Sequence, residues 1–561
     1  MAIETKGRLG DRLVQRGACS ARDIEVALSE QRRAWRPLGE ILVSLGFVQP
    51  EEIARLSAED LGIEFVRARD LECDPELRGV IDREFVRATG AFPISLENGV
   101  LRVAMVHPED PERVAAVRAQ FPFPLALAVL TERDLAELVR LYLAEERLAV
   151  ADLLRDVAGP GGGERPASGE WPVEQLVHAV LLDGVRRGAT DIHVEPEERM
   201  TRVRYRVDGL LIQGENLPRE ASEAVASRLK VLANLDIAER RRPQDGRLRV
   251  ELDGRGVGMR VSILPSADGE NVVLRVLDRS AGMLALGDLG ISPRHQTLLA
   301  RVSRRDHGLF LVTGPTGSGK TTTLYSLLAG IDASVRNVAT IEDPIEYRLP
   351  LLRQSQVDPS IGFGFQEGLR ALLRQDPDVI LVGEIRDRET ADMAIKASMT
   401  GHLVFSTLHT NSALGAIPRL SDLGVDPFLV EDSLIGVLAQ RLVRRVCASC
   451  ARPAQLDERE RRFLGDDPGR PMRGAGCKRC RETGFAGRLA VAELFLPDEA
   501  MADVLRTGAN LFELHRLATA AGFQRIQDDG REKVRQGLTT YDELLRVNQS
   551  HRLADHERED V

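Results

Sequence analysis

The sequence predicts an α/β protein of several domains, and its C-terminal half should form a doubly wound parallel sheet with helices on both faces. Apolar runs such as Leu309–Val312 and Val379–Val382 suit strands that are buried on both faces. They alternate with stretches in which leucines recur at helical spacing, as at Leu324 and Leu327. The glycine-rich segment Gly314–Thr321 connects the first of these strands to the first of these helices. Such alternation is typical of parallel α/β sheets.

Bulk composition places the chain among ordinary globular proteins. It has 561 residues, of which 43% are hydrophobic and 29% are charged, and its net charge is −10. That acidic balance argues against a protein that coats nucleic acid, which usually needs a basic face. The N-terminus lacks a signal peptide, and no apolar stretch is long enough to span a membrane. We therefore expect a cytoplasmic protein without a nucleic-acid partner, whose membrane contacts run through partner proteins.

The order of patterns along the chain predicts five regions. A short repeat, Arg8–Gly17 and Pro37–Gly46, leads twice into helix-like sequence, and a Gly/Pro/Ser-rich run at 159–169 cannot bury apolar area. A helix at Val173–Val185 and an alternating strand at Arg202–Val207 follow that run. The predicted regions are a helical N-terminal module at 1–66, a small α/β domain at 67–147, a flexible linker at 148–172, a smaller α/β domain at 173–300 and a larger α/β domain with the glycine-rich segment at 301–561.

The glycine-rich segment fits the phosphate-loop pattern Gly-x4-Gly-Lys-Ser/Thr. Its glycines let backbone N–H groups surround a phosphate, Lys320 adds a positive charge, and the Thr321 hydroxyl can bind Mg²⁺. The strand before it and the helix after it match the context that this loop requires. We predict that ATP binds here and is hydrolysed, through residues Gly314, Pro315, Thr316, Gly317, Ser318, Gly319, Lys320, Thr321 and Thr322.

Three further segments carry polar groups next to predicted core strands. Glu384 ends an apolar strand, where a nucleotide fold places a carboxylate that holds metal-bound water. The acidic segment Thr340–Glu346 is either a solvated loop or the source of a group that polarises the attacking water. His402 and His409 bracket a strand, and either sense the γ-phosphate or are structural.

A pair of arginines precedes the strand that leads to Glu384. Arg370 and Arg374 lie on a predicted helix, from which they can reach phosphates or pair with surface acids. The residues themselves do not decide between these two roles.

These segments, in this order, resemble the secretion ATPase superfamily of type II secretion, type IV pilus and related machines. The likeness extends through Ala189–Pro196, Arg242–Arg247 and Arg260–Pro265. Asp236–Arg247 and Gly436–Val443 look more like type II secretion ATPases, the general secretion pathway E type, than like pilus assembly or retraction ATPases. The resemblance implies a RecA-like motor domain and a smaller PAS-like α/β domain. It also implies a homohexamer that powers pseudopilus assembly.

The resemblance also assigns roles to individual residues. Glu346 would activate water, Glu384 would support Mg²⁺, and His402 and His409 would sense the nucleotide. Arginines from the smaller domain and from the motor domain would reach the triphosphate in the assembled hexamer: Arg260, Arg275, Arg370 and Arg374. The N-terminal region would contact the inner-membrane platform and cytoplasmic-domain proteins of the secretion machine, so that the ATPase is peripherally attached to the inner membrane.

Other functions share part of this evidence. A type IV pilus assembly motor would use the same chemistry with different partners. A nucleic-acid-translocating motor would also carry a phosphate loop, but the acidic balance and the cysteine pairs favour export. A nucleotide-gated scaffold without turnover would not need Glu346, Glu384 and Lys320.

Two Cys-x2-Cys pairs form the second chemical motif of the motor domain, within 447–480. Paired thiols at this spacing are a strong zinc signature, and four thiolates close the tetrahedron and make the site structural. A disulfide and a redox pair are the alternatives, and a reducing compartment and the local sequence disfavour them. The predicted Zn²⁺ ligands are Cys447, Cys450, Cys477 and Cys480.

The first N-terminal repeat resembles the cyclic-di-GMP-binding motif of MshE-type domains. Arg8, Gly17 and Gln31 match that motif, whereas the second repeat departs from it at Pro37 and Asp60. Half of the site would therefore lack an arginine and an amide. Cyclic-di-GMP binding and docking onto a membrane-platform partner both stay open for this module.

Overall fold

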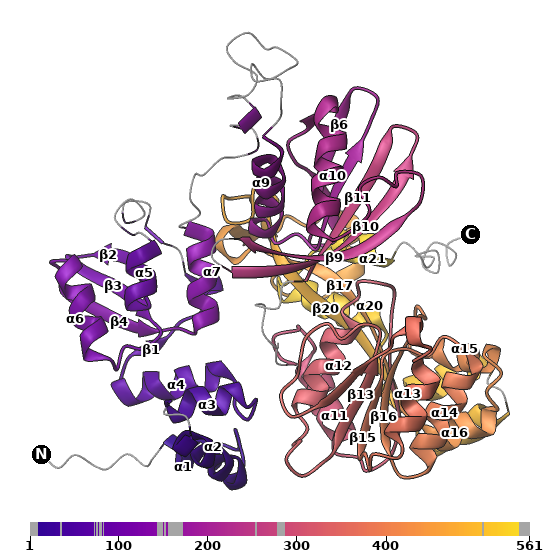
Figure 1. The fold of residues 1–561 in the computed structure, drawn as a ribbon. Coiled ribbons are helices and arrows are strands. Elements are labelled where there is room, and N and C mark those ends of the chain that lie inside the picture. The colour runs from indigo at the N-terminus through magenta and orange to yellow at the C-terminus, as the bar shows by residue number, and fades with distance from the viewer. Residues whose placement is uncertain are drawn as a thin grey trace, which may run out of the picture. The chain divides into compact units, whose positions relative to one another are not determined.

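We examined a computed structural model of the chain, and its fold is shown in Figure 1. The structure describes residues 9–33, 36–71, 73–74, 77, 81, 83–142, 150, 153–154, 172–252, 255–277, 286–507 and 510–548. The chain divides into two compact units, residues 1–65 with 283–561 and residues 66–282. Within the described residues, no helix is both long and apolar enough to cross a membrane.

The N-terminal module consists of two similar helical hairpins, as the sequence repeat predicts. Gly17 and Gly46 follow the first helix of each hairpin and have φ of 70° and 75°, a conformation that favours glycine. The hairpins share a small core around Leu13, Ile41 and Leu56. The helices are α1 (Leu9–Gln15), α2 (Ala21–Arg33), α3 (Leu38–Ser44) and α4 (Pro50–Leu61).

The first part of the second unit is a small α/β domain with its own core. Strands β2 and β3 pair antiparallel and β3 and β4 pair parallel, in agreement with the small α/β domain predicted here. The elements that build this region are β1 (Glu64–Phe65), η1 (Ala68–Asp70), α5 (Arg83–Thr89), β2 (Ala91–Glu97), β3 (Val100–Met105), α6 (Pro111–Gln120), β4 (Leu125–Val129) and α7 (Glu132–Tyr142).

The second part of that unit is an antiparallel sheet in the order β7-β6-β5-β11-β10-β9. Alternate strand residues such as Val203 and Val261 are buried in one core with α9 and α10, so the other face of the sheet is polar. The elements are α9 (Val173–Arg186), β5 (Asp191–Pro196), β6 (Met200–Val207), β7 (Leu210–Gln213), β8 (Leu217–Pro218), η3 (Arg219–Ala221), α10 (Ser222–Leu232), β9 (Gln244–Leu252), β10 (Arg255–Ser266) and β11 (Gly269–Leu277).

One boundary of this core differs from our prediction. Val150 and Leu153, which we placed in the linker, are buried with the residues of the smaller domain. These two side chains of the predicted linker therefore pack, and the Gly/Pro/Ser-rich run at 159–169 lies outside the described residues.

The motor domain contains the predicted parallel sheet, in the order β14-β13-β15-β16-β12-β17-β20, with β20 antiparallel at one edge. Leu309 and Leu311 of β12 face one core with α13 and α14, and Phe310 and Val312 face another with α11 and α12. Figure 1 shows these helices on the two faces of the sheet. Alternation of apolar side chains into two cores is the physical basis of the doubly wound fold.

Helices and strands of the nucleotide-binding half alternate along the chain. They are α11 (Pro293–Val302), β12 (Gly308–Thr313), α12 (Lys320–Ala329), β13 (Val338–Glu342), β14 (Arg353–Gln356), η5 (Pro359–Ile361), α13 (Phe365–Leu372), β15 (Val379–Val382), α14 (Arg388–Met399), β16 (Leu403–Leu408), α15 (Ala416–Asp422) and α16 (Pro427–Ser433).

The C-terminal part begins with the long strand β17 and carries the cysteine pairs. A two-stranded sheet of β18 and β19 lies between the pairs, and the last helices pack on β17 and β20. The elements are β17 (Leu434–Val446), η6 (Ala448–Cys450), β18 (Ala451–Pro453), α17 (Glu458–Leu464), β19 (Met472–Gly474), β20 (Phe485–Phe495), α18 (Glu499–Arg506), α19 (Leu511–Ala520), α20 (Ile526–Arg535) and α21 (Tyr541–Asn548).

Candidate active site and metal centre

The phosphate loop connects β12 to α12, and its backbone needs glycine at three positions. Gly314, Gly317 and Gly319 have φ of 145°, 78° and 86°, which side chains with a Cβ rarely adopt. A Cβ at Gly314 would lie 2.4 Å from the backbone oxygen of Gln440, so the loop also lies too close to β17 for a larger residue. The loop is thus a cradle that only glycine can form, as phosphate binding by backbone N–H groups requires.

Lys320 folds back over the loop that precedes it. Its Nζ donates to the backbone oxygens of Gly314 at 2.9 Å and Pro315 at 3.4 Å. Burial lowers the pKa of Lys320, and the nearby Glu384 carboxylate opposes that shift. The ammonium group is therefore held by weak acceptors in a partly desolvated place, where an anionic phosphate would be a better partner.

Glu384 and His409 meet at the carboxyl edge of the parallel sheet, where β15 and β16 end. The Glu384 carboxylate is 3.6 Å from Nε2 of His409 and 2.5 Å from the guanidinium of Arg386. Burial and the charge of Lys320 lower the pKa of His409, and Glu384 acts in the opposite direction. Lys320, Glu384 and His409 thus form one group of interacting charges beside the phosphate loop.

Glu346 lies on the loop after β13, at the same edge of the sheet. Its side chain is exposed, and its backbone N–H donates to the Tyr325 hydroxyl at 3.3 Å. Tyr325 in turn donates to the buried carboxylate of Glu342, which also accepts from Thr340 at 2.6 Å. The helix that begins at the phosphate loop therefore holds the backbone that carries Glu346.

His402 does not join this group. It immediately precedes β16, and its backbone oxygen accepts from Gly308 at the start of β12, so it lies at the amino edge of the sheet. Seven residues of extended chain separate it from His409, which is roughly 20 Å. Its Nδ1 lies 2.9 Å from the backbone oxygen of Ala397. The geometry therefore supports nucleotide sensing within one chain for His409 and a structural role for His402.

Arg370 and Arg374 are exposed near the end of α13 that leads to the start of β15. The segment that follows them is tied to Asn337, which precedes β13: Asn337 donates to the backbone oxygens of Gln375 and Asp376. Both arginines therefore lie toward the amino edge of the sheet. The phosphate loop of the same chain lies at the carboxyl edge.

Arg260 and Arg275 are directly opposite each other in the ladder of β10 and β11, in the second unit. Arg247 of β9 pairs with Arg260 in the same row, and Asp191 of β5 and Arg206 of β6 continue it. Arg275 contacts Asp191 at 3.1 Å and keeps 61% of its side chain exposed. Like charges directly opposite in a ladder are unfavourable, and the single acid of the row, Asp191, offsets only part of its positive charge.

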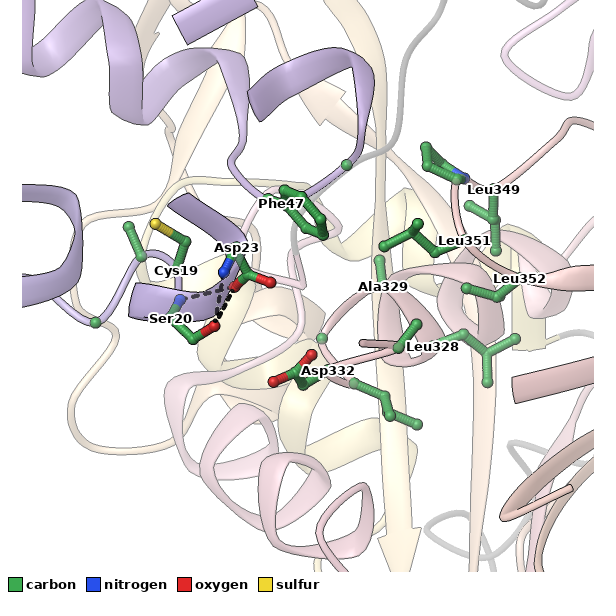
Figure 2. A pocket seen from close by; sticks show the side chains of 17 residues that line it. Cys19, Ser20, Asp23, Phe47, Leu328, Ala329, Asp332, Leu349, Leu351 and Leu352 are labelled. Atoms are coloured by element: carbon green, nitrogen blue, oxygen red, sulfur yellow. Dashed lines mark hydrogen bonds between the residues drawn. The ribbon is translucent and has the colours of Figure 1, made fainter. Parts of the chain in front are cut away.

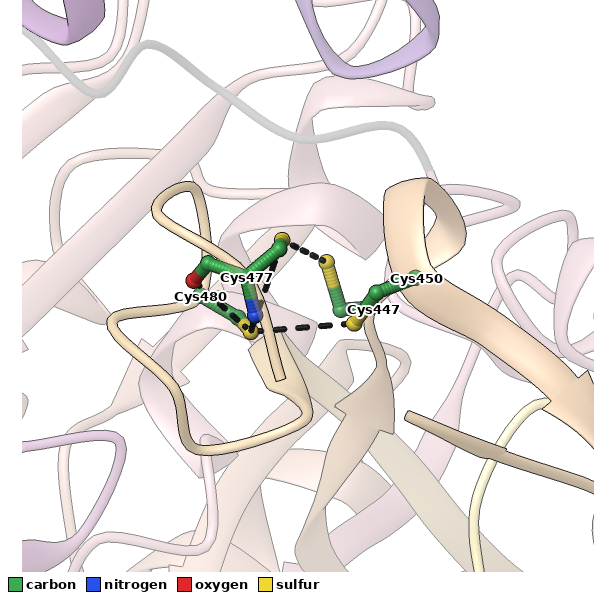
Figure 3. Close-up of side chains that lie close together, drawn as sticks. All are labelled: Cys447, Cys450, Cys477 and Cys480. Carbon is green, nitrogen blue, oxygen red and sulfur yellow. Dashed lines mark hydrogen bonds between the residues drawn. The ribbon is translucent and has the colours of Figure 1, made fainter. Parts of the chain in front are cut away.

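The four clustered cysteines converge on one point (Figure 3). Their sulfurs all lie within 4.8 Å of one another, and the closest pairs are 3.7, 3.8 and 3.9 Å apart. A tetrahedron with metal–sulfur bonds of about 2.3 Å has sulfurs about 3.8 Å apart. These distances exclude disulfides within the cluster and fit one tetrahedral metal ion.

Backbone N–H groups support the charged form of one thiol in this cluster. Cys480 is buried, which raises its pKa, but N–H groups of Cys477 and Gly484 point at its sulfur at 3.1 and 3.3 Å. The net effect lowers the pKa of Cys480 to about 7. Thiolate is the form that binds metal, so the backbone around this turn is suited to a ligand role.

The N-terminal module contributes to a separate pocket of about 400 Å³, shown in Figure 2. It is lined by the turn at Gly17–Ser20 and by Phe47 on one side, and by the end of α12 and residues 349–352 on the other. Of the described residues of the cyclic-di-GMP motif, Gly17 lines this pocket, whereas Gln31 donates to the backbone oxygen of Arg36. Arg8 lies outside the described residues.

Asp60, where that motif expects a glutamine, is paired with Arg12, and Arg16 is paired with Glu59. These ion pairs join α1 to α4 and so link the two repeats. Cyclic-di-GMP binding stays a prediction.

Sequence reasoning missed several residues of the site. Arg386, Tyr325 and Gln440 were not among the candidates, yet they contact Glu384, Glu346 and the phosphate loop. A signal existed for Gln440, which is the polar residue that directly follows the apolar run Leu434–Ala439. Tyr325 resembles any buried aromatic residue of an amphipathic helix, so only its hydroxyl partners reveal its position.

A parallel sheet with a glycine cradle, a lysine and an edge carboxylate defines a phosphate-loop ATPase, here with a four-cysteine module in the same domain. The family model described as "Type II/IV secretion system protein" matches residues 166–546, and the chain belongs to that family. A second model, the MshEN domain, matches residues 61–149, which is the small α/β domain and not the helical repeat.

Individual proteins show the same relationship. The chain is 51% identical to the type II secretion system protein E of Pseudomonas aeruginosa over 67% of this chain and 75% of that protein. It is 35% identical to the type IV pilus assembly ATPase PilB of Myxococcus xanthus over 96% and 98% of the two chains. The solved structure of the Yersinia pseudotuberculosis ATPase DotB shares the fold, with a TM-score of 0.50 and 19% identity over 68% of this chain and 96% of that chain.

Proposed function

We propose that this chain is the ATPase of a type II secretion system and hydrolyses ATP at the phosphate loop. The observation that carries the proposal is the convergence of Lys320, Glu384 and His409 on one sheet edge, beside a loop that only glycine can form. The identity of 51% with a type II secretion protein E favours this role over pilus assembly, since two pilus assembly ATPases are 35% and 38% identical to this chain.

Within this site each residue has a distinct task. Backbone N–H groups of the loop and Lys320 bind the β- and γ-phosphates, and Glu346 accepts a proton from the attacking water. Thr321 and Glu384 would hold Mg²⁺ and its water, and the bound ion would neutralise charge on the phosphates. His409, in contact with Glu384, reports the presence of the γ-phosphate. The glycine cradle and the inward-facing lysine fit the phosphates of a nucleoside triphosphate.

The complete site requires neighbouring chains. Arg370 and Arg374 lie toward the sheet edge opposite their own phosphate loop, so they can stabilise the leaving phosphoryl group only in an adjacent subunit. The basic row of Arg260 and Arg275 supplies a second anion-binding surface from the smaller domain. A homohexamer, the arrangement that the family resemblance implies, brings these groups to each nucleotide.

Export is then a mechanical consequence of the ATP cycle. The N-terminal region attaches the hexamer to the inner-membrane platform and cytoplasmic-domain proteins, on the cytoplasmic side, and changes between nucleotide states move that attachment. The four-cysteine cluster holds one structural Zn²⁺, because four thiolates leave no open position for a reaction. Pilus assembly uses the same chemistry, and deletion of the gene separates the two functions by whether secreted enzymes or pili are lost.

A pair of variants tests the catalytic proposal. Lys320→Ala should lose ATP binding, and Glu384→Gln should bind ATP without turnover, both measured by titration with a fluorescent ATP analogue and by phosphate release. Turnover by Glu384→Gln at the wild-type rate would overturn the assignment of that carboxylate. Stimulation of the wild-type ATPase by DNA or RNA would instead favour a nucleic-acid motor.

A further inference from the structure

Gln440 is a buried polar side chain at the end of the apolar first half of a long strand, next to the buried Arg441. It lies on β17, next to β12, and is only 1% exposed, while Leu438, Ala439 and Val443 around it are buried hydrophobic residues. Burying an amide without hydrogen-bond partners is unfavourable, because its polar groups lose their bonds to water. Such a residue is retained only where both ends of its amide are satisfied, so its partners indicate its task.

Both partners of Gln440 belong to the phosphate loop and its helix. Nε2 donates to the backbone oxygen of Ser318 at 2.7 Å, and Oε1 accepts from the Thr323 hydroxyl at 2.8 Å. The Ser318 carbonyl can only accept, so the amide nitrogen must face it, and the orientation of the amide follows from the chemistry. One side chain thus connects the end of the loop to the first turn of α12.

The loop lies directly against this strand position. A Cβ at Gly319 would be 3.1 Å from Nε2 of Gln440, and a Cβ at Gly314 would be 2.4 Å from its backbone oxygen. The first and last glycines of the loop therefore pack on Gln440 itself. A change at Gln440 alters the surface on which the loop lies.

The bond to Ser318 fixes the direction of one peptide group. In a trans peptide the C=O and the following N–H point in opposite directions. Because the Ser318 oxygen points at Gln440, the N–H of Gly319 points away from β17, into the open side of the loop. An N–H in that direction is what a phosphate needs as a partner.

We propose that Gln440 is a positioning residue of the ATPase, which sets the Ser318–Gly319 peptide in the orientation that binds phosphate before the nucleotide arrives. This inference rests on the proposed function of the loop. Gln440 does not touch the reacting atoms, so its loss should weaken nucleotide binding and leave the chemical step nearly intact.

The test compares two variants with a matched control. Gln440→Met keeps the volume and removes both hydrogen bonds. Gln440→Glu keeps the acceptor for Thr323 and places a carboxylate oxygen against the Ser318 carbonyl. The control is Thr539→Val. It removes a buried hydroxyl that donates, at 2.8 Å, to the backbone oxygen of Arg444, which lies on β17 as Gln440 does. For each variant we would measure KM and kcat for ATP, Kd for an ATP analogue, and Tm without nucleotide.

We expect KM and Kd to rise about tenfold in both Gln440 variants, with kcat changed less than about threefold. Thr539→Val should lower Tm by about as much as Gln440→Met does, but it should leave KM for ATP unchanged. The KM of Gln440→Glu should also improve as the pH falls, because a protonated carboxyl can donate to Ser318. Gln440→Met offers no such donor, so its KM defect should not depend on pH.

An unchanged KM in Gln440→Met, or an equal rise in Thr539→Val, would show that Gln440 is only a structural residue. If Gln440→Met does not fold, Thr323→Val removes one of the two bonds, and an unchanged KM there would overturn the inference. Lys320→Ala distinguishes a failure of the Gln440 proposal from a failure of the proposed ATP-binding function. If Lys320→Ala binds ATP normally, the proposed function of the loop is itself wrong.

Discussion

At the residue scale, the candidate site combines charged groups that neighbouring residues hold in place. Lys320 rests on two backbone oxygens, Glu384 contacts Arg386 and His409, and the backbone of Glu346 is tied to Tyr325. The carboxylate of Glu346 itself is exposed. A base that is free while its backbone is fixed can reach a water molecule without a rearrangement of the loop.

The first prediction concerns this base. Glu346→Gln should reduce kcat at least about a hundredfold, because an amide cannot accept the proton of the attacking water. Binding of ATP should persist, since the phosphate loop is unchanged. Phosphate release and analogue titration measure the two quantities. Glu389→Gln, an exposed acid at the start of α14, is the control, and a similar loss of kcat in both variants would remove Glu346 from its role.

At the element scale, the long strand β17 connects the nucleotide site to the C-terminal part. Gln440 contacts the phosphate loop, and Arg444, four residues on, is held by Glu543 of α21. Glu493 of the neighbouring β20 accepts from Ala413 after β16 and from Ile526 at the start of α20. The cysteine module follows directly after β17, so its position depends on the same strand.

The second prediction tests the attachment of α21. The Glu543 side chain is only 2% exposed; burial raises its pKa, but Arg546 and Arg444 outweigh burial and lower it from 4.5 to about 2. Because the pKa of Glu543 is lower in the folded than in the unfolded chain, its charge stabilises the fold at pH values above about 4.5. That contribution is lost as the pH falls from about 4.5 toward 2. We expect Glu543→Gln to lose about 3 kcal/mol at pH 7.

Thermal unfolding of wild type and Glu543→Gln between pH 7 and pH 3.5 provides the measurement. The difference in Tm between wild type and Glu543→Gln should become smaller as the pH drops below about 4.5. Glu532→Gln, which changes a more exposed acid of α20, is the control and should show little effect at any pH. A gap that stays constant with pH would mean that the charge of Glu543 is not what holds α21.

The third prediction concerns the metal. Freshly purified protein should contain one zinc ion per chain by elemental analysis, and Cys480→Ser should lose it, because three thiolates bind zinc more weakly than four. The Tm of this variant should fall, since the turn that carries Cys477 and Cys480 loses its connection to Cys447 and Cys450. Cys73→Ser, which changes a cysteine outside the cluster, should keep the metal. Zinc-free wild-type protein would contradict the assignment.

At the scale of the whole molecule, one chain does not hold all the groups of a complete site. The phosphate loop lies at one edge of the motor sheet, while Arg370 and Arg374 lie toward the other. The basic row of Arg260 and Arg275 belongs to a different compact unit. In the proposed mechanism, a neighbouring subunit would therefore supply the arginines that the loop's own chain holds away from it.

The fourth prediction tests this assembly by mixing inactive chains. Lys320→Ala lacks a working loop and Arg374→Ala lacks the arginine, so each should be inactive alone. If the arginine acts in a neighbour, a random equal mixture should recover about a quarter of wild-type ATPase activity, because that share of interfaces pairs an intact loop with an intact arginine. A mixture of Lys320→Ala and Glu346→Gln, whose defects share one site, is the control. Equal activity in the two mixtures would place Arg374 in its own subunit's site.

The sequence by itself determined the local chemistry. The phosphate loop, the parallel sheet and the cysteine pairs follow from glycine spacing, apolar runs and paired thiols, because these depend on residues that are neighbours in the chain. Only the tertiary structure shows that His402 and His409 lie at opposite edges of the sheet. It also shows that Val150 and Leu153 are buried in a core and that Gln440 bonds to Ser318. The strand direction decides which end of a strand reaches the site, and the pairing of β12 with β17 joins residues more than a hundred positions apart. Neither the direction of a strand nor its pairing with a distant strand can be read from spacing along the chain.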